Sequence, residues 1–569
     1  MDHAGVKTPP AVPALPAPPA LPALPALIGV TAVYAAAFFV LTWPSVTHFR
    51  THFFADDVDG LQNVWNLWWV QRAVIVLHQS PWYTHDLHFP YGSSLLAHTL
   101  NPFNGFAAIA LAPFMSAAAV HNALVTFGFV AGGVTAYLLA HHLIRSHLPS
   151  VLAGFIFTFS SFHFAHAEGH LQLVSLEWIP LFVLLWLKLV TEPTIGRGVG
   201  AAVVLFLVIL CDYYYFLYCV ITGACILGWW MLRHRGANAL FGRQRMAALG
   251  AFTLVAAATS GFLAGSLVWS SMRDPLTGAH PASEFSLDLL SPLIYGGHWR
   301  FGSLTKRFWI RLAANVHESS VHLGFSVIVL ALYAWRKRHV LNAPIINLFA
   351  FLLVFFLVLA FGPTPQIAGK AILGDHAVLP YGWLETLIPP LAISGVPIRM
   401  MVMVMLSAAI LAGFGFSLLL RGSAGRQRVA VAIACLLAVE YWPKPIPNLS
   451  LPVPKYVDIV RNLPGRDGVL DTVATPSIAM FYQTIHQKPL AFGYLAREPR
   501  SVAAHDQQLE TLLSQARFDR LWPDFRLRYV VSADPRLRAW SGARTLWADG
   551  EVAVIDVATD GRSSPPRIP

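Results

Sequence analysis

Charged residues are scarce in this sequence. Asp, Glu, Lys and Arg together make up 12% of the 569 residues, while 56% are hydrophobic and the mean hydropathy is +0.56. A soluble domain carries roughly 25% charged residues, and neither a soluble fold nor a disordered chain could keep so much apolar surface in water. The composition excludes both classes and indicates a polytopic membrane protein.

Cysteines are also few, and nucleotide-binding motifs are missing. The four cysteines lie in apolar stretches without Cys-x-x-Cys or Cys/His ligand spacing, so we interpret them as buried thiols. No P-loop, GxGxxG, HExxH or GxSxG motif occurs in a usable context. An ATP-driven pump is therefore not expected.

Apolar stretches of membrane-spanning length recur along the chain. Residues 1–26 form a Pro/Ala tract that cannot bury a core, and we interpret them as a disordered cytoplasmic tail. Residues 27–442 are expected to form a transmembrane domain with a first outer loop at 44–116. About eleven crossings are expected, near residues 27–43, 117–143, 150–165, 171–190, 197–211, 212–232, 245–270, 319–335, 343–362, 398–420 and 428–442.

Basic residues between these stretches predict the orientation. The net charge of +10 comes from small clusters that all fall on one side of the predicted membrane, at Arg145, Lys188/Arg197, Arg233/Arg235/Arg243/Arg245, Arg336/Lys337/Arg338 and Arg421/Arg426/Arg428. By the positive-inside rule that side is the cytoplasm, so the N-terminus is expected inside. Counting the proline-broken segment 101–116 as a full crossing would break this agreement, so we interpret it as a short re-entrant or interfacial piece.

The composition changes at about residue 443. A proline-rich linker, WPKPIPNLSLPVPKY, is followed by the strand-like runs GVLDTVA, LRYVVSA and VAVIDVA and by one helical run, AAHDQQLETLLSQARFDRLW. This pattern predicts a small α/β domain at 443–569. It is too polar to span the membrane and is expected outside it.

Three aspartates follow the first crossing. Asp56, Asp57 and Asp59 precede LQNVWNLWWVQRAVIVL, a segment that is amphipathic at helical period. Its apolar stripe is Leu61, Trp65, Trp68 and Trp69, and its polar stripe is Asp59, Gln62, Asn63 and Asn66. The indole rings predict a helix lying along the membrane interface. The aspartates could serve as a general base, hold a divalent cation or cap the helix, and the pattern leaves these roles open.

A second outer segment, FHFAHAEGHLQLVSLEW, is rich in ionisable groups. His163, His166 and His170 fall on one face of a continuous helix, with Glu168 and Glu177 nearby. Three histidines could bind a transition metal. The alternative is a polar pocket wall that faces the aspartates.

Two further motifs lie at predicted outer helix ends. CDYYYFLY places Asp212 and Tyr213 at an outer turn, where tyrosines could stack on a sugar ring or form an interfacial aromatic belt. Arg399 in GVPIRMMVM begins a crossing, where a cation could bind a lipid phosphate or act as a snorkelling anchor. His317 and Glu318 are weaker instances of the same pattern.

Together these motifs resemble the GT-C superfamily of integral-membrane glycosyltransferases. The shared features are the acidic motif after the first crossing, the Trp-rich helix, the second polar loop HAEGHLQLVSLEW and the outer C-terminal domain. More closely, DGLQNVWNLWW, FPYGSSLLAHTLNPFNG, GHLQLVSLEWIPL, CDYYYFLY, GVPIRMMVM and MFYQTIHQKPLAFGYLAR resemble bacterial YfhO-like membrane proteins. The resemblance covers most of the chain.

The resemblance implies an all-α polytopic membrane enzyme of the bacterial cytoplasmic membrane. It would transfer a sugar, with inversion, from a polyprenyl-phosphate donor to a glycan, lipid or protein acceptor of the cell envelope. Its partners would be these substrates and membrane lipids, and not nucleic acid. The base would come from the aspartate cluster. We favour Asp59, which opens the helix, although DDVD departs from the common DE or DxD patterns.

The resemblance also implies a substrate site and leaves the metal open. The expected substrate-binding residues are Asn63, His163, His166, His170, Glu177, Asp212, Tyr213 and Arg399. Some GT-C enzymes need a divalent cation and others do not. Mg²⁺ or Mn²⁺ would here be held by Asp56, Asp57, Asp59 and Glu168.

Two alternatives belong to other functional classes. A flippase or transporter of lipid-linked saccharides would place charges near the bilayer midplane and show internal repeats, whereas the charges here lie at helix ends. A non-catalytic envelope assembly protein would have a degenerate site, and the DDVD motif argues against it.

Overall fold

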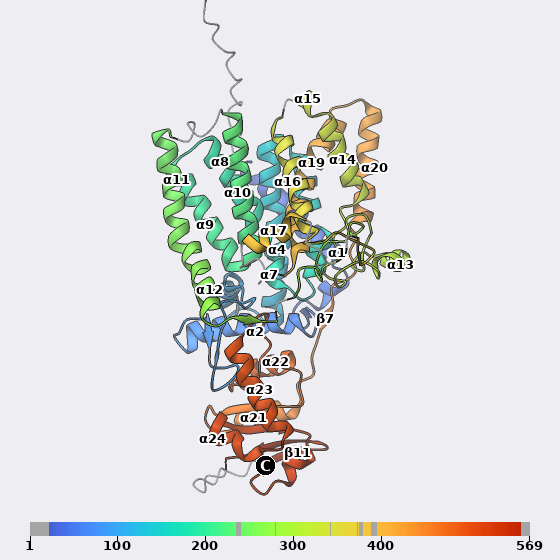
Figure 1. Ribbon diagram of the computed structural model, residues 1–569. Helices are drawn as coiled ribbons and strands as arrows, with labels where there is room; N and C mark the ends of the chain where they lie inside the picture. The colour runs from blue at the N-terminus through green and yellow to red at the C-terminus, as the bar shows by residue number, and fades with distance from the viewer. Residues whose placement is uncertain are drawn as a thin grey trace, which may run out of the picture.

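The computed structural model shows a bundle of apolar helices with a smaller, sheet-containing C-terminal part below it (Figure 1). This arrangement confirms the predicted fold class. The structure describes residues 22–234, 241–278, 280–341, 343–372, 374, 379–387 and 395–558. The predicted boundary at residue 443 stays a prediction.

Six helical segments in the described residues are long and apolar enough to cross a membrane. They are α1 (Leu24–Leu41), α4 (Ala117–Ile144), α5 with α6 (His147–Thr158 and Ser161–His166), α10 (Tyr213–Arg233), α11 with α12 (Arg243–Ala256 and Phe262–Arg273), and the 3₁₀ turn Pro397–Met400 with α19 (Met401–Leu420). Shorter apolar helices are α3 (Pro102–Leu111), α8 (Trp178–Thr191), α9 (Ile195–Cys211), α14 (Phe325–Arg336) and α16 (Ile345–Ala360). The count of eleven crossings stays a prediction, with α20 (Ala424–Glu440) at the last of them.

Helix α1 corrects the predicted tail. It begins at Leu24, so the last three residues of the segment 1–26 belong to the first helix. Residues 1–21 lie outside the described part of the chain. Pro25 lies in the first turn of the helix, where backbone N–H groups have no carbonyl partner within the helix. Proline has no N–H group, so no hydrogen bond is lost at this position.

The bundle is built around α19. Every residue from Met401 to Ser417 is buried, as expected of a helix that is apolar on all sides. It packs against α5, α14 and α16. A side chain at Gly415 would collide with the main-chain oxygen of Leu330, so glycine is what lets α14 approach so closely.

The C-terminal part has a four-stranded sheet in the order β11-β12-β10-β8. Strand β10 pairs in parallel with β8, and the other two pairings are antiparallel. The strands are β8 (Gly468–Asp471), β10 (Leu527–Ser532), β11 (Arg544–Asp549) and β12 (Val552–Asp556), and the main helices are α21 (Lys455–Asn462), α22 (Pro476–His486), α23 (Arg500–Ser514), α24 (Leu521–Phe525) and α25 (Pro535–Ala539).

Helix α2 (Asp59–Gln71) lies between the bundle and the C-terminal part (Figure 1). Trp65 and Trp69 are fully buried and belong to one apolar cluster with Val457 and Met480 of the C-terminal part. The Trp65 indole N–H also donates to Gln483 Oε1 at 2.6 Å. Two rings of the predicted apolar stripe are therefore covered by protein, and the placement of α2 along the membrane interface stays a prediction.

Short strands fasten the C-terminal part to the outer loops. Strand β1 (Phe53–Phe54) pairs with β7 (Asn448–Leu449), and β4 (Leu276–Thr277) pairs with β9 (Glu498–Pro499), both antiparallel. Strands β2 (Tyr83–Thr84) and β3 (Ser93–Ser94) form a hairpin within the first outer loop. The β4–β9 pairing fixes the segment before β9 next to the end of α12.

Candidate functional site

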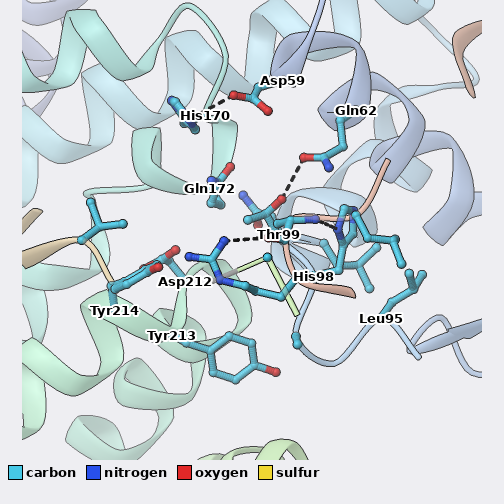
Figure 2. A pocket seen from close by; sticks show the side chains of 18 of the residues that line it. Asp59, Gln62, Leu95, His98, Thr99, His170, Gln172, Asp212, Tyr213 and Tyr214 are labelled. Atoms are coloured by element: carbon cyan, nitrogen blue, oxygen red, sulfur yellow. Dashed lines mark hydrogen bonds and ion pairs between the residues drawn. The ribbon is translucent and has the colours of Figure 1, made fainter. Parts of the chain in front are cut away.

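A cavity of about 680 Å³ lies between the C-terminal part and the helix ends that face it. Its walls come from α2, the loop residues 95–102, the α9–α10 turn, the 3₁₀ turn before α19 and residues 493–498. Five predicted site residues line it: Asp59, His170, Asp212, Tyr213 and Arg399. Figure 2 shows Asp59 and His170 joined in one wall and Tyr213 in another.

Asp59 presents its carboxylate to this cavity. Its Oδ2 is 3.3 Å from His170 Nε2, and its Oδ1 accepts a hydrogen bond from the Tyr494 hydroxyl at 2.9 Å. Burial raises the pKa of Asp59, but the hydrogen bonds from His170 and Tyr494 lower it, and the net pKa lies below the ordinary value. Asp59 is therefore ionised at neutral pH.

The other two aspartates have different surroundings. Asp56 Oδ1 accepts from the backbone amides of Val58 at 3.0 Å and Gly60 at 2.8 Å, so Asp56 caps α2. Burial raises the pKa of Asp56, and these two amide bonds oppose the rise. Asp57 is exposed. Within the described residues, neither of these two aspartates lines the cavity.

Behind His170 lies a buried polar chain. His166 Nδ1 is 3.2 Å from His170 Nδ1, and His166 Nε2 is 3.7 Å from Glu318 Oε2. His166 Nε2 and Glu318 Oε2 have no hydrogen-bond partner within the described chain. Since His170 uses Nε2–H toward Asp59, its Nδ1 accepts from His166, which turns the lone pair of His166 Nε2 toward Glu318.

Arg399 closes this chain at the opposite wall. Its Nε and Nη2 atoms lie 2.9 and 2.5 Å from Glu318 Oε1, and its guanidinium sits 5.0 Å from the centre of the Tyr214 ring. The side chain is 11% exposed. A snorkelling anchor would extend to water, whereas Arg399 is held by a buried carboxylate and lines the cavity.

The tyrosine motif divides between cavity and core. Tyr213 and Tyr214 line the cavity, while Tyr215 and Tyr218 are fully buried. Asp212 caps α10 by accepting from the Tyr215 amide at 3.0 Å. The motif thus contributes both a wall of the cavity and the packing that holds it.

Four predicted substrate-binding residues are absent from the described cavity walls. Asn63 donates to the main-chain oxygens of Asp59 at 2.8 Å and Gly169 at 2.7 Å, which ties α2 to the second outer segment. His163 stacks on Phe129 with ring centres 3.7 Å apart. Glu177 is buried, and His166 reaches the cavity only through His170. In this structure Asn63 tethers α2 and His163 packs on Phe129, and their predicted substrate contacts stay predictions.

The predicted metal ligands do not come together. Among the described residues, three sets offer ligand atoms within 4.8 Å of one another: His166/His170/Glu318, Glu168/His298/His317 and His88/Glu498/Asp506. Glu168 turns away from the aspartates, with Oε2 at 3.3 Å from His298 Nε2. Asp56, Asp57, Asp59 and Glu168 therefore do not form one set, because one aspartate caps α2 and another is exposed.

The C-terminal part supplies site residues that the sequence patterns did not predict. Gln62 donates to the main-chain oxygen of Tyr494 at 2.8 Å and accepts from Thr99 at 3.1 Å (Figure 2). His98 Nδ1 accepts a hydrogen bond from the Ala496 backbone amide at 3.3 Å, and His98 Nε2 is hydrogen-bonded to Asn66 Oδ1 at 2.8 Å. Only contacts across hundreds of residues show that residues 493–498 belong to the site.

No family model and no curated protein sequence matches the chain. Its structure is similar to mycobacterial arabinofuranosyltransferase AftD, with a TM-score of 0.61 and 12% identity over 95% of this chain and 42% of that one. It is also similar to the Archaeoglobus fulgidus oligosaccharyltransferase, with a TM-score of 0.46 and 12% identity over 90% of this chain and 69% of that one. A third similar structure is ArnT from Cupriavidus metallidurans, with a TM-score of 0.42 and 12% identity over 95% of this chain and 99% of that one. The AftD similarity shows that the two chains share a fold. The closer resemblance to YfhO-like proteins stays a prediction.

Proposed function

We propose that this protein is a membrane glycosyltransferase that moves a sugar from a polyprenyl-phosphate donor to an acceptor of the cell envelope. The observation that carries the proposal is the ionised carboxylate of Asp59, held by His170 and Tyr494 in a cavity at the ends of apolar helices. A donor with a lipid tail and a polar head needs this arrangement, because its two ends require membrane and water at once.

The proposed reaction is an inverting displacement at the anomeric carbon. Asp59 takes the proton of the acceptor hydroxyl, whose oxygen attacks the anomeric carbon as the bond to the donor phosphate oxygen breaks. The polyprenyl phosphate leaves with that electron pair. His170 and Tyr494 act as positioning residues, because they hold the Asp59 carboxylate and keep it unprotonated.

Arg399 is suited to the phosphate that leaves. Glu318 occupies Nε and Nη2 of Arg399, so Nη1 is the guanidinium nitrogen without a contact to that carboxylate. A guanidinium binds phosphate oxygens in a planar geometry that lysine cannot reproduce. We assign Arg399 to the charge that develops on the donor phosphate.

A divalent cation would be held by His166, His170 and Glu318 rather than by the aspartates. The buried, unpartnered His166 Nε2 and Glu318 Oε2 fit this role. Two imidazoles and one carboxylate suit Mn²⁺ or Zn²⁺ better than Mg²⁺. A cation there would add positive charge near the donor phosphate.

The test is transfer by purified protein in proteoliposomes. Undecaprenyl phosphate carrying different labelled hexoses and pentoses is supplied with envelope extract, and released undecaprenyl phosphate is measured. We expect turnover with one of these sugars, and Asp59→Asn should lower it roughly 10²–10⁴-fold at unchanged abundance. Asp57→Asn, which changes an exposed neighbour, is the matched control.

Two results would contradict the proposal. Equal turnover by wild type and Asp59→Asn would remove the catalytic role of Asp59. Passage of intact labelled donor across the bilayer without release of undecaprenyl phosphate would favour the flippase alternative.

A further inference from the structure

A second cluster of metal-ligating side chains lies where the first outer loop meets the C-terminal part. It consists of His88 from the loop, Glu498 from β9 and Asp506 from α23. One ligand atom from each lies within 4.8 Å of the others. The cluster shares no residue with the Asp59, His170 and Arg399 chain.

His88 is the buried centre of this cluster. Its side chain is fully buried, and Nδ1 is 2.8 Å from Asp506 Oδ2. Nδ1 is thus the ring nitrogen that faces the carboxylates, while Nε2 lies against Gly493 and has no hydrogen-bond partner within the described residues.

The two carboxylates are brought to His88 by separate elements. Thr277 donates its hydroxyl to the main-chain oxygen of Glu498 at 2.9 Å, so the β4–β9 pairing fixes the backbone there. Asp506 lies in the second turn of α23, and its Oδ1 is 3.1 Å from His505 Nδ1. Two carboxylates this close repel each other unless a positive charge lies between them.

We propose that His88, Glu498 and Asp506 bind a divalent transition-metal ion of the Zn²⁺ class. One imidazole and two carboxylates supply nitrogen and oxygen ligands that Zn²⁺ accepts, and water would complete the coordination. Zn²⁺ relieves the repulsion between the carboxylates and uses the imidazole.

The position of this site gives the metal a structural role. Glu498 also lines the Asp59 cavity, at the end of the segment that carries Tyr494. A metal ion at His88 would therefore fasten residues 493–498 to the first outer loop. The inference does not rest on the proposed glycosyl transfer, since a metal clamp at this junction could serve any function of the cavity.

The test is metal binding by the purified full-length protein. The protein is stripped with EDTA, given ZnCl₂ and desalted, and bound zinc is measured by mass spectrometry. His88→Gln and Asp506→Asn should each lose one equivalent of zinc. Loss of an outer-shell partner costs roughly 10–100-fold in metal affinity, so loss of a direct ligand should cost at least about 100-fold. His85→Gln, an exposed histidine of the same loop, should bind as wild type does.

A second comparison distinguishes zinc bound at His88 from zinc bound at His166 and His170. His166→Gln/His170→Gln should keep the zinc that His88→Gln loses, and its zinc X-ray absorption should show one imidazole with ligands at about 2.0–2.2 Å. The proposal is overturned by zinc content that is equal in wild type, His88→Gln and Asp506→Asn. Spectra of His166→Gln/His170→Gln without imidazole would overturn it even if His88→Gln does not fold.

Discussion

The hydroxyl of Tyr494 donates a hydrogen bond to Asp59 across a sequence separation of 435 residues. Asp59 opens the helix after the first crossing, and Tyr494 lies between α22 and β9 of the C-terminal part. The contact places the C-terminal part inside the candidate site. A truncated chain that ends before this part would lose a wall of the cavity as well as one donor to the carboxylate.

Removing the Tyr494 hydroxyl should change the pH dependence of transfer. Burial raises the pKa of Asp59 and its two donors lower it, so Tyr494→Phe should raise that pKa. A hydrogen bond to a charged group contributes roughly 1.5–3 kcal/mol, which predicts that the acid limb of kcat/KM moves to higher pH by about one to two units. Tyr482→Phe is the control, because its hydroxyl contacts the main-chain oxygen of Pro452. Coincident pH profiles for wild type and Tyr494→Phe would contradict the positioning role.

Substitutions at Arg399 should affect the donor. Arg399→Lys keeps the charge and loses the planar geometry, so KM for the polyprenyl donor should rise. Arg399→Ala should raise it further, by roughly 10- to 100-fold, the loss of one charged hydrogen-bonding group. Arg421→Ala, at the exposed opposite end of α19, is the control. Reduced stability with an unchanged KM in Arg399→Ala would instead indicate that Arg399 serves only to balance Glu318.

His98 should make the junction with the C-terminal part sensitive to acid. Burial lowers the pKa of His98 to about 3, and its Nδ1 accepts the Ala496 amide only when it is unprotonated. The unfolded chain binds this proton near pH 6.5. The stabilisation is therefore complete above pH 6.5 and declines as the pH falls toward 3.

Thermal unfolding at two pH values checks this prediction. Between pH 6.5 and 5, one such histidine should cost roughly 2 kcal/mol. His98→Ala should be less stable at pH 7.5 but should lose less on acidification than wild type does. His85→Gln should follow wild type. Equal acid sensitivity of His98→Ala and wild type would assign the effect to other buried histidines.

The orientation predicted from the basic clusters can be tested directly. If these clusters face the cytoplasm, alkaline phosphatase fused after Pro569 should be active and a green fluorescent protein in the same place should be dark. The same pair of reporters after Arg338, in a predicted cytoplasmic loop, should give the opposite result. A fluorescent C-terminal fusion would place the Asp59 cavity on the cytoplasmic side. It would contradict the proposal that a lipid-linked donor is used at the outer face.

Five residues selected from local sequence patterns line the described cavity, and their catalytic and binding roles stay predictions. The period of α2 and the position of Asp59 at its start follow from residues close in sequence. Arg399 and Asp212 could be selected from the sequence because an ionisable side chain at the end of an apolar helix is energetically unfavourable and therefore rare. In contrast, the separate roles of Asp56 and Asp59 depend on which carboxylate reaches the amides of Val58 and Gly60, and a spacing of three residues does not decide that.

The sequence by itself determined that this chain is a membrane protein with helical and α/β parts, because hydropathy and periodicity act over one element at a time. Only the tertiary structure decided that Trp65 and Trp69 of α2 pack against the C-terminal part, since an apolar stripe on a helix does not say which apolar surface covers it. It also decided that Glu318 joins His166 and Arg399, and that Tyr494 reaches Asp59. These contacts link residues far apart in the chain, and they form only when separate helices and loops pack around one cavity.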